Sequence, residues 1–168
     1  MYALSIEPTL ESIMRSPIQA VGADTTVVDA LLLCETRGVH HVPLFDGTKL
    51  LGVVCTCDLE EVALDAPVRR ALYHPPIVLD VGATISDALR CMGEEIAGSV
   101  LVARAGDPVG IVTREDALAA ANDDTPDFLC EACGARTHLK HGARGLLCLD
   151  CRNSSYPAGD DDELGGSE

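Results

Sequence analysis

Two stretches with one shared pattern decide the fold of this chain: Gly52-Val53-Val54-Cys55-Thr56-Cys57-Asp58 and Gly110-Ile111-Val112-Thr113-Arg114-Glu115-Asp116. In each, a glycine and two apolar residues end a predicted strand, and a helix begins directly afterwards. The first turn of a helix has backbone N–H groups without an intrahelical partner. In the second stretch, a threonine hydroxyl and a carboxylate stand beside those N–H groups. This arrangement suits a hydroxylated, anionic ligand.

The two stretches belong to a longer internal repeat. Residues Leu10 to Val62 match Val68 to Ala120 at a constant offset of 58, without a gap. The identical pairs include Pro17 and Pro75, Thr26 and Thr84, Asp29-Ala30-Leu31 and Asp87-Ala88-Leu89, Val42 and Val100, and Asp58 and Asp116. A repeat of this length indicates that one supersecondary unit occurs twice.

Each repeat predicts the element order helix, strand, helix, strand, turn, strand, helix. The expected elements of the first repeat are a short helix before Pro17, a strand over 18–21, a helix capped by Thr26 and ended by Gly38, and strands over 40–45 and 50–54. Thr26 with Asp29 three residues later resembles a capping box, and Asp46-Gly47 is a hairpin signal. The second repeat predicts the same elements from Thr84 onward. We therefore predict an α+β fold.

The sequence resembles the CBS-domain pair, also called the Bateman module, over roughly residues 7 to 121. The residues that carry the resemblance are Ser12-Ile13-Met14, Gly38 to Leu44, Gly52-Val53-Val54, Gly98 to Val102 and Gly110 to Asp116. The resemblance implies tandem β-α-β-β-α units related by a pseudo-twofold axis, with two clefts between their sheets. In this family such clefts bind adenosine ligands such as AMP, ATP or S-adenosylmethionine, and two modules usually form a homodimer.

The second repeat matches the family's adenosine pattern, in which a glycine, two apolar residues, Ser or Thr, two variable residues and Asp follow one another. Gly110, Thr113 and Asp116 fill these positions. A carboxylate can accept hydrogen bonds from both ribose hydroxyls, and the apolar run Ile77-Val78-Leu79 can cover the adenine. By position, Arg15, Arg114 and His74-Pro75-Pro76 are candidates for the phosphate side. The alternative is that Thr113 and Asp116 only cap a helix, and the two roles are compatible.

The first repeat departs from the pattern, because Cys55 stands where the hydroxyl residue belongs, although Gly52 and Asp58 are kept. A thiol is a weak hydrogen-bond donor, so this cleft ranks second. His40 and His41 stand where AMP-binding relatives often carry a His-Arg pair near the phosphate, or they form a solvated strand start. Cys55 and Cys57 also suggest a redox sensor, against the simpler interpretation of buried thiols, which also covers Cys34 and Cys91.

The formal net charge of −15 argues against a whole surface that binds nucleic acid or an anionic membrane. The chain has no basic segment followed by an apolar one at its start and no run of eighteen apolar residues. We therefore expect a soluble, cytoplasmic protein without membrane attachment. It has no phosphate-binding glycine loop, nucleophile elbow or open metal site, so we expect that it is not an enzyme.

A second, smaller domain is predicted from two Cys-x-x-Cys pairs, Cys130 with Cys133 and Cys148 with Cys151, separated by 14 residues. Four thiolates complete a tetrahedral shell, which predicts structural zinc. Disulfides or a thioredoxin-like pair are the alternatives, and His138 and His141 are expected to be loop residues. The predicted divisions are repeats at 7–64 and 65–121, a linker at 122–128, a zinc ribbon at 129–152 and a disordered acidic tail at 153–168.

The ribbon also resembles, more distantly, the finger of DksA/TraR-type transcription regulators, although the helical hairpin of those proteins is missing. Its bases Arg136, Lys140, Arg144 and Arg152 outnumber its acids. We expect a regulatory protein that senses an adenosine ligand and passes the change through the ribbon to a macromolecular partner, whose identity the sequence leaves open. The alternatives are a scaffold protein with empty clefts and a nucleic-acid-binding regulator that acts through the ribbon.

Overall fold

The structure is a computed structural model that describes residues 7–73, 75–121, 130–133, 140–142, 145–148 and 151. The chain divides into two compact units, Met1–Phe128 and Leu129–Glu168, and each is described separately. The predicted linker at 122–128, the tail at 153–168, His74 and His138 lie outside the described residues.

The first unit contains the two predicted repeats, and the α+β fold class is confirmed. The first repeat has α1 (Leu10–Ile13), β1 (Val21–Gly22), α2 (Val27–Arg37), β2 (His41–Asp46), β3 (Lys49–Cys55) and α3 (Thr56–Leu59). The second has the 3-10 helix η1 (Val68–Ala71), β4 (Val78–Asp80), α4 (Ile85–Glu94), β5 (Ser99–Arg104), β6 (Asp107–Thr113) and α5 (Arg114–Ala121). In the second unit, β7 (Lys140–Gly142) pairs with β8 (Gly145–Leu147).

The capping signals that the sequence predicts are present. The backbone N–H of Asp29 donates to Thr26 Oγ1 at 3.3 Å at the start of α2. Thr84 and Asp87 form the reciprocal capping box of α4. Gly38 ends α2 in the left-handed conformation, with φ of 63°. Both helices therefore begin where side chains satisfy unpaired backbone groups, and α2 ends at a glycine that adopts the left-handed conformation.

Each repeat forms a three-stranded sheet with a parallel pair followed by an antiparallel hairpin, in the orders β1-β2-β3 and β4-β5-β6. The predicted strand over 18–21 is shorter in the structure and begins at Val21. In the second repeat, Leu101 N–H donates to the Ile77 carbonyl at 2.8 Å. The equivalent of Leu101 in the first repeat is Pro43, which has no N–H, so the matching bond cannot form there.

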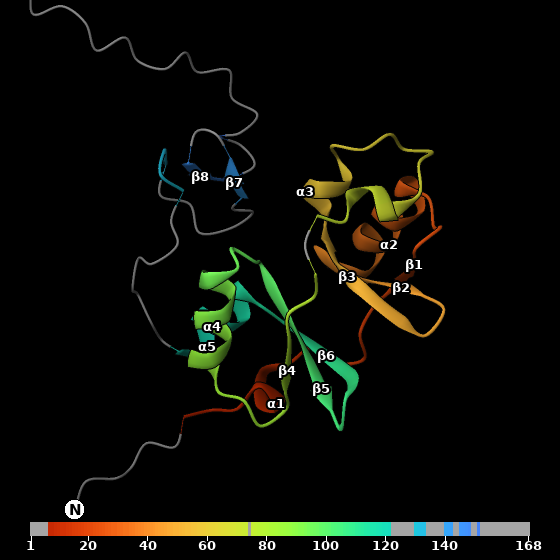
Figure 1. Ribbon diagram of the computed structural model, residues 1–168. Helices are drawn as coiled ribbons and strands as arrows, with labels where there is room; N and C mark the ends of the chain where they lie inside the picture. Colours follow the sequence, from red (N-terminus) through yellow and green to blue (C-terminus); the bar gives the residue numbers. More distant parts are fainter. Residues whose placement is uncertain are drawn as a thin grey trace, which may run out of the picture. The chain divides into compact units, whose positions relative to one another are not determined.

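The two repeats exchange their N-terminal segments, which the sequence did not predict. Leu10 of α1 packs in the core of the second repeat with Ile85, Ala88 and Met92 of α4. Conversely, Val68 and Ala71 of η1 pack in the core of the first repeat. Figure 1 shows α1, in red, beside β4 rather than beside the orange strands β2 and β3. Each hydrophobic core therefore includes a segment from the other repeat.

Opposite charges accompany this exchange. Glu11 in α1 and Arg69 in η1 occupy equivalent positions of the repeat. Glu11 forms an ion pair with Arg104 of the second repeat, whereas Arg69 forms one with Asp24 of the first repeat. In the unexchanged arrangement, Glu11 would approach Asp24 and Arg69 would approach Arg104, so like charges would meet. The charges therefore favour the observed arrangement.

None of the helices in the described part of the chain combines the length and the apolar character that a membrane-spanning helix needs.

Candidate functional site

Asp116 lies in the first turn of α5, and its carboxylate is already well bonded. Its Oδ2 accepts from Thr113 Oγ1 at 2.6 Å and from Thr113 N–H at 3.1 Å. The N–H of Asp116 in turn donates to Thr113 Oγ1 at 3.2 Å. Thr113 and Asp116 thus form a reciprocal cap, as the alternative interpretation of the sequence predicts. The cap fixes the orientation of the carboxylate.

The remaining acceptor sites of Asp116 face Arg15. Arg15 Nη2 donates to Asp116 Oδ1 at 2.7 Å, and Arg15 Nε lies 3.2 Å from each carboxylate oxygen. The Arg15 backbone is fixed on β6, because its N–H donates to the Ile111 carbonyl at 2.9 Å and its carbonyl accepts from Ile111 N–H at 3.1 Å. The sequence named Arg15 as a candidate for the phosphate side by position but did not predict that it pairs with Asp116.

Gly110 allows this segment to approach β6. A Cβ at position 110 would lie 2.6 Å from Met14 Sδ and 3.0 Å from Met14 Cβ. Met14 precedes Arg15 and packs against the core of the second repeat. The glycine of the pattern is therefore required for packing, because a side chain there would displace the segment that carries Arg15.

The contacts around Asp116 change its acidity. Burial acts to raise its pKa, but the hydrogen bonds from Arg15 and Thr113, together with the Arg15 charge, hold the pKa of Asp116 below its ordinary value. Asp116 is therefore ionised near neutrality. A carboxylate with a lowered folded-state pKa stabilises the fold above its unfolded pKa, and this stabilisation is lost as the pH falls through the folded value.

We expect Asp116→Asn to destabilise the protein by roughly 1 kcal/mol at pH 7, because it removes the ion pair with Arg15 but keeps an acceptor for Thr113. The difference from the unchanged protein is expected to shrink as the pH falls below about 4, near the ordinary pKa of aspartate. Urea unfolding at a series of pH values measures it. A difference that stays constant down to the lowest accessible pH would contradict the assignment.

The predicted apolar wall at Ile77-Val78-Leu79 is divided between two directions. Ile77 and Leu79 are partly buried and pack against the core of the second repeat. Val78 lies between them and is 42% exposed. Successive strand residues point to opposite faces of a sheet, so only Val78 of the three offers its side chain on the other face. Val78 pairs there with Leu101 of β5, which is fully buried.

Arg114 lies near Asp116 in the sequence but is directed elsewhere. Its Nη2 donates to the Ala97 carbonyl at 2.6 Å, and the residue is only 5% exposed. Burial lowers the pKa of Arg114. Its backbone N–H also donates to the Gly98 carbonyl at 2.9 Å. These contacts attach the start of α5 to the loop after α4.

The equivalent site in the first repeat has different chemistry. Cys55 N–H donates to Asp58 Oδ2 at 3.2 Å, so the carboxylate retains its place at the start of α3. Hydrogen bonding to Cys57 and burial raise the pKa of the Cys55 thiol. A raised thiol pKa disfavours the reactive thiolate that a redox sensor requires. The equivalent of Arg15 in this repeat is Tyr73, which has no guanidinium to form the contact that Arg15 makes with Asp116.

The two predicted histidines have different surroundings. His40 is exposed, and its carbonyl accepts from Thr56 N–H at 2.9 Å. His41 begins β2 opposite Cys55, and its ring lies against the second repeat. A Cβ added to Gly98 would lie 2.5 Å from His41 Nε2. His41 therefore contributes to the contact between the repeats.

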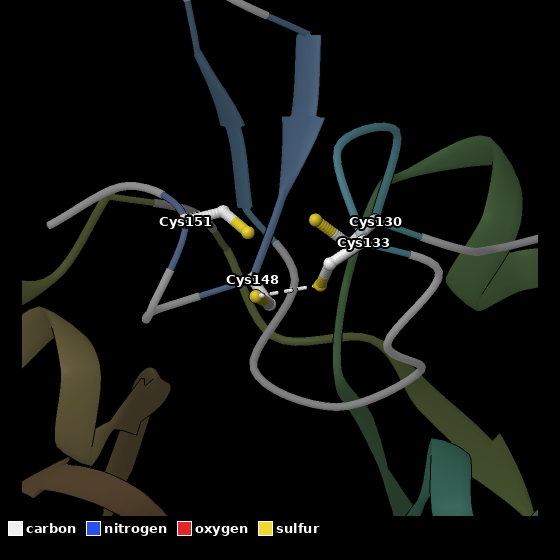
Figure 2. A group of neighbouring side chains, drawn as sticks. All are labelled: Cys130, Cys133, Cys148 and Cys151. Atoms are coloured by element: carbon white, nitrogen blue, oxygen red, sulfur yellow. Dashed lines mark hydrogen bonds between the residues drawn. The ribbon is translucent and has the colours of Figure 1, made fainter. Parts of the chain in front are cut away.

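The four cysteines of the second unit come together, as Figure 2 shows. Their sulfur atoms all lie within 4.8 Å of one another, and those of Cys133 and Cys148 are 3.6 Å apart. Cys130 and Cys148 are buried, whereas Cys133 is exposed. Cys148 directly follows β8, so the hairpin places it beside the turn that contains Cys133. The four thiols form a group that can hold a metal ion.

The donor set fits a tetrahedral metal ion. Zn–S bonds of about 2.3 Å place the sulfur atoms of a tetrahedral site roughly 3.8 Å apart, similar to the Cys133 to Cys148 separation. Hydrogen bonds from backbone amides, led by that of Cys148, lower the pKa of Cys130 to about 6. Hydrogen bonds with Cys133 and Cys148 raise the pKa of Cys151 to about 12. Four crowded thiols therefore do not all ionise readily without a cation.

Comparisons with known proteins agree with this architecture. A probable manganese-dependent inorganic pyrophosphatase from Thermotoga maritima is 32% identical over 79 residues, which are 46% of this chain but only 14% of that protein. The crystal structure of CBSX2 in complex with AMP is 26% identical, with a TM-score of 0.57, and the match covers 68% of this chain and 96% of that one.

A further structure shares the fold. The CBS domain of a bacterial CNNM/CorC family Mg²⁺ transporter, solved in complex with ATP, is 21% identical with a TM-score of 0.60, over 67% of this chain and 85% of that one. The CBS domain family model matches residues 10–65 and 67–123. Both matched segments contain the sheet and capped helices described above, and together they span most of the chain, which therefore belongs to the CBS-domain family.

Proposed function

We propose that this chain is a non-enzymatic regulatory protein that binds an adenosine-containing ligand of the AMP, ATP or S-adenosylmethionine class at Asp116 and transmits the binding through a zinc ribbon to a macromolecular partner. The observation that carries the proposal is the Thr113–Asp116 pair at the start of α5. It places a fixed carboxylate in the first turn of helix α5. The similarity to CBSX2, whose structure contains AMP, supports the choice of ligand.

The chemistry of an adenosine ligand matches the residues around Asp116. Carboxylate oxygens accept the two hydroxyl groups of a ribose, and the exposed Val78 offers apolar surface for the adenine ring. The guanidinium of Arg15 lies beside the same carboxylate and can bind a phosphate. The first repeat lacks both the threonine hydroxyl and the arginine, so we expect the ligand at Asp116 and not at Asp58.

We propose structural zinc as the metal of the ribbon. Four sulfur ligands leave no open position for a substrate, and a segment this short lacks a core of its own. When bound, zinc would be held by Cys130, Cys133, Cys148 and Cys151 and would supply the folding free energy of the segment. A homodimer is the assembly that the family resemblance implies, and sedimentation or light scattering measures it.

A second candidate function is a constitutive scaffold that binds no nucleotide. The observation in its favour is that the acceptor sites of Asp116 are already occupied by Thr113 and Arg15. In this case the ribbon alone would contact the partner. Binding of a nucleotide distinguishes the two functions.

We expect an adenosine nucleotide to raise the melting temperature of the zinc-loaded protein. Ligand at about 100 times its dissociation constant stabilises the folded state by roughly 2.7 kcal/mol, and each kcal/mol raises the melting temperature of a chain of this size by about 2–4 °C. A thermal-shift panel of AMP, ADP, ATP and S-adenosylmethionine at millimolar concentration measures this, with guanosine and inorganic phosphate as controls. An unchanged melting curve with all four ligands would contradict the proposed function.

A further inference from the structure

We propose that Arg15 closes the ribose-binding carboxylate of Asp116 and thereby selects an adenosine ligand that carries a phosphate over uncharged adenosine and over S-adenosylmethionine. This inference rests on the proposed function and narrows its ligand class. It follows from the number of acceptor sites on Asp116, from the freedom of Arg15 to move and from the charge that a moved Arg15 requires.

A ribose cannot bind the carboxylate of Asp116 through both hydroxyls while Arg15 is in place. A carboxylate has about four lone-pair positions. Thr113 uses Oδ2 twice, and Arg15 contacts both oxygens through Nη2 and Nε. No position remains for the two ribose hydroxyls. One of the present donors therefore has to leave.

The donor that can leave is Arg15. Thr113 is the last residue of β6, pairs with Ser99 and caps the helix that contains Asp116, so its hydroxyl is held by local structure. The Arg15 side chain is 58% exposed, whereas that of Asp116 is 16% exposed. A long side chain at the surface can rotate without a change in the backbone. Its anchor to Ile111 keeps it beside the site after it rotates.

A released Arg15 loses its ion pair with Asp116, and a new anion beside it restores such a contact. Besides Asp116, the charge of Glu115 acts on Arg15. Once the ligand is bound, Asp116 is bonded to the ribose. Uncharged adenosine breaks the Arg15–Asp116 ion pair and gives Asp116 new hydrogen-bond partners, but it gives Arg15 no anion. S-adenosylmethionine has one carboxylate, but its sulfonium and ammonium groups leave it with a net positive charge at the same place. A phosphate accepts two N–H groups of the guanidinium and brings only negative charge, so it compensates the exchange best of the three ligands.

The test is calorimetric titration of AMP, adenosine and S-adenosylmethionine into the zinc-loaded full-length chain, unchanged and as Arg15→Ala. The unchanged protein is expected to bind AMP at least about tenfold more tightly than adenosine or S-adenosylmethionine, the range of one charge-assisted hydrogen bond. In Arg15→Ala, AMP binding weakens and adenosine binding strengthens because Asp116 is no longer closed. The ratio of the dissociation constant of adenosine to that of AMP therefore falls toward one.

Two variants control the test. Arg104→Ala removes an arginine of similar exposure whose partner is Glu11, outside the site, and is expected to keep the preference of the unchanged protein. Arg15→Lys keeps the charge but not the fork geometry and is expected to give an intermediate preference. Circular dichroism checks that every variant is folded.

The outcomes separate this inference from the proposed function. If adenosine or S-adenosylmethionine binds the unchanged protein as tightly as AMP, or if Arg15→Ala keeps the preference, Arg15 does not select the ligand although the adenosine site stands. If none of the three binds the unchanged protein or Arg15→Ala, the proposed function and this inference both fail.

Discussion

Removal of zinc is expected to unfold the segment from Cys130 to Cys151 while the two repeats stay folded. Among its described residues, the segment has a two-stranded hairpin, β7 with β8, and a small apolar cluster of Cys130, Leu147, Cys148 and Cys151. Such a core does not compensate the conformational entropy of folding. Binding of the proposed zinc ion to four thiolates would contribute on the order of 10 kcal/mol, the largest effect that we expect here. The repeats have separate cores of aliphatic residues.

Hydrogen exchange followed by mass spectrometry, before and after a strong chelator, measures this directly. Peptides from 130–151 are expected to lose protection, whereas those from α2, α4 and the two sheets keep it. Cys148→Ser is expected to reproduce the effect of the chelator, and Cys91→Ser in α4 is the matched control outside the cluster. Loss of protection throughout the chain would contradict the division into two units, and unchanged protection at 130–151 would contradict the proposed zinc.

Leu10→Ala is expected to destabilise the first unit by about 3 kcal/mol, although it lies near the start of the chain. Leu10 is fully buried in the core of the second repeat, and its N–H donates to the Ala83 carbonyl at 2.9 Å. Truncation leaves a cavity in the core of the second repeat, where α1 contacts β6 and α5, and the surrounding side chains can only partly close it. The effect tests whether α1 is part of a hydrophobic core.

The matched control is Leu32→Ala in α2, whose side chain is 60% exposed. Surface substitutions usually change stability by less than about 0.5 kcal/mol. Urea unfolding of the three proteins gives the comparison. A loss of less than about 1 kcal/mol for Leu10→Ala would mean that α1 is not part of the core.

The element order could be predicted because its signals are local. Thr26 and Thr84 cap helices through residues three positions away, and Gly38 ends one through its own backbone angles. The repeat doubles every such signal, so a weak one in one copy is supported by the other. The cysteine pairs likewise predicted the thiol group that the structure shows, because two knuckles with two-residue spacing favour one common centre.

The exchange could not be predicted because both segments are apolar and equivalent in the repeat. Apolar character shows that Leu10 and Val68 are buried but not which core receives them. A retrospective signal exists in the opposite charges of Glu11 and Arg69. The Arg15–Asp116 pair joins residues 101 positions apart and depends on the exchange, so it was beyond sequence reasoning.

The apolar wall and Arg114 show a second limit of sequence reasoning. Successive side chains of a strand point to opposite faces of the sheet, so the strand divides Ile77, Val78 and Leu79 between two faces. Because all three residues are apolar, the sequence does not show this division. Arg114 directly follows Thr113, but its side chain turns to the Ala97 carbonyl. The direction of a side chain at a strand-helix junction depends on the neighbouring loop, which a short motif does not specify.

The central claim is that one adenosine ligand binds at Asp116 and not at its equivalent, Asp58. Calorimetric titration of AMP into the zinc-loaded protein, with Asp116→Ala and Asp58→Ala as a matched pair of cap variants, tests it most directly. We predict one site per chain in the unchanged protein and in Asp58→Ala, and no measurable binding to folded Asp116→Ala. Binding that survives in Asp116→Ala, or that is lost only in Asp58→Ala, would contradict the assignment.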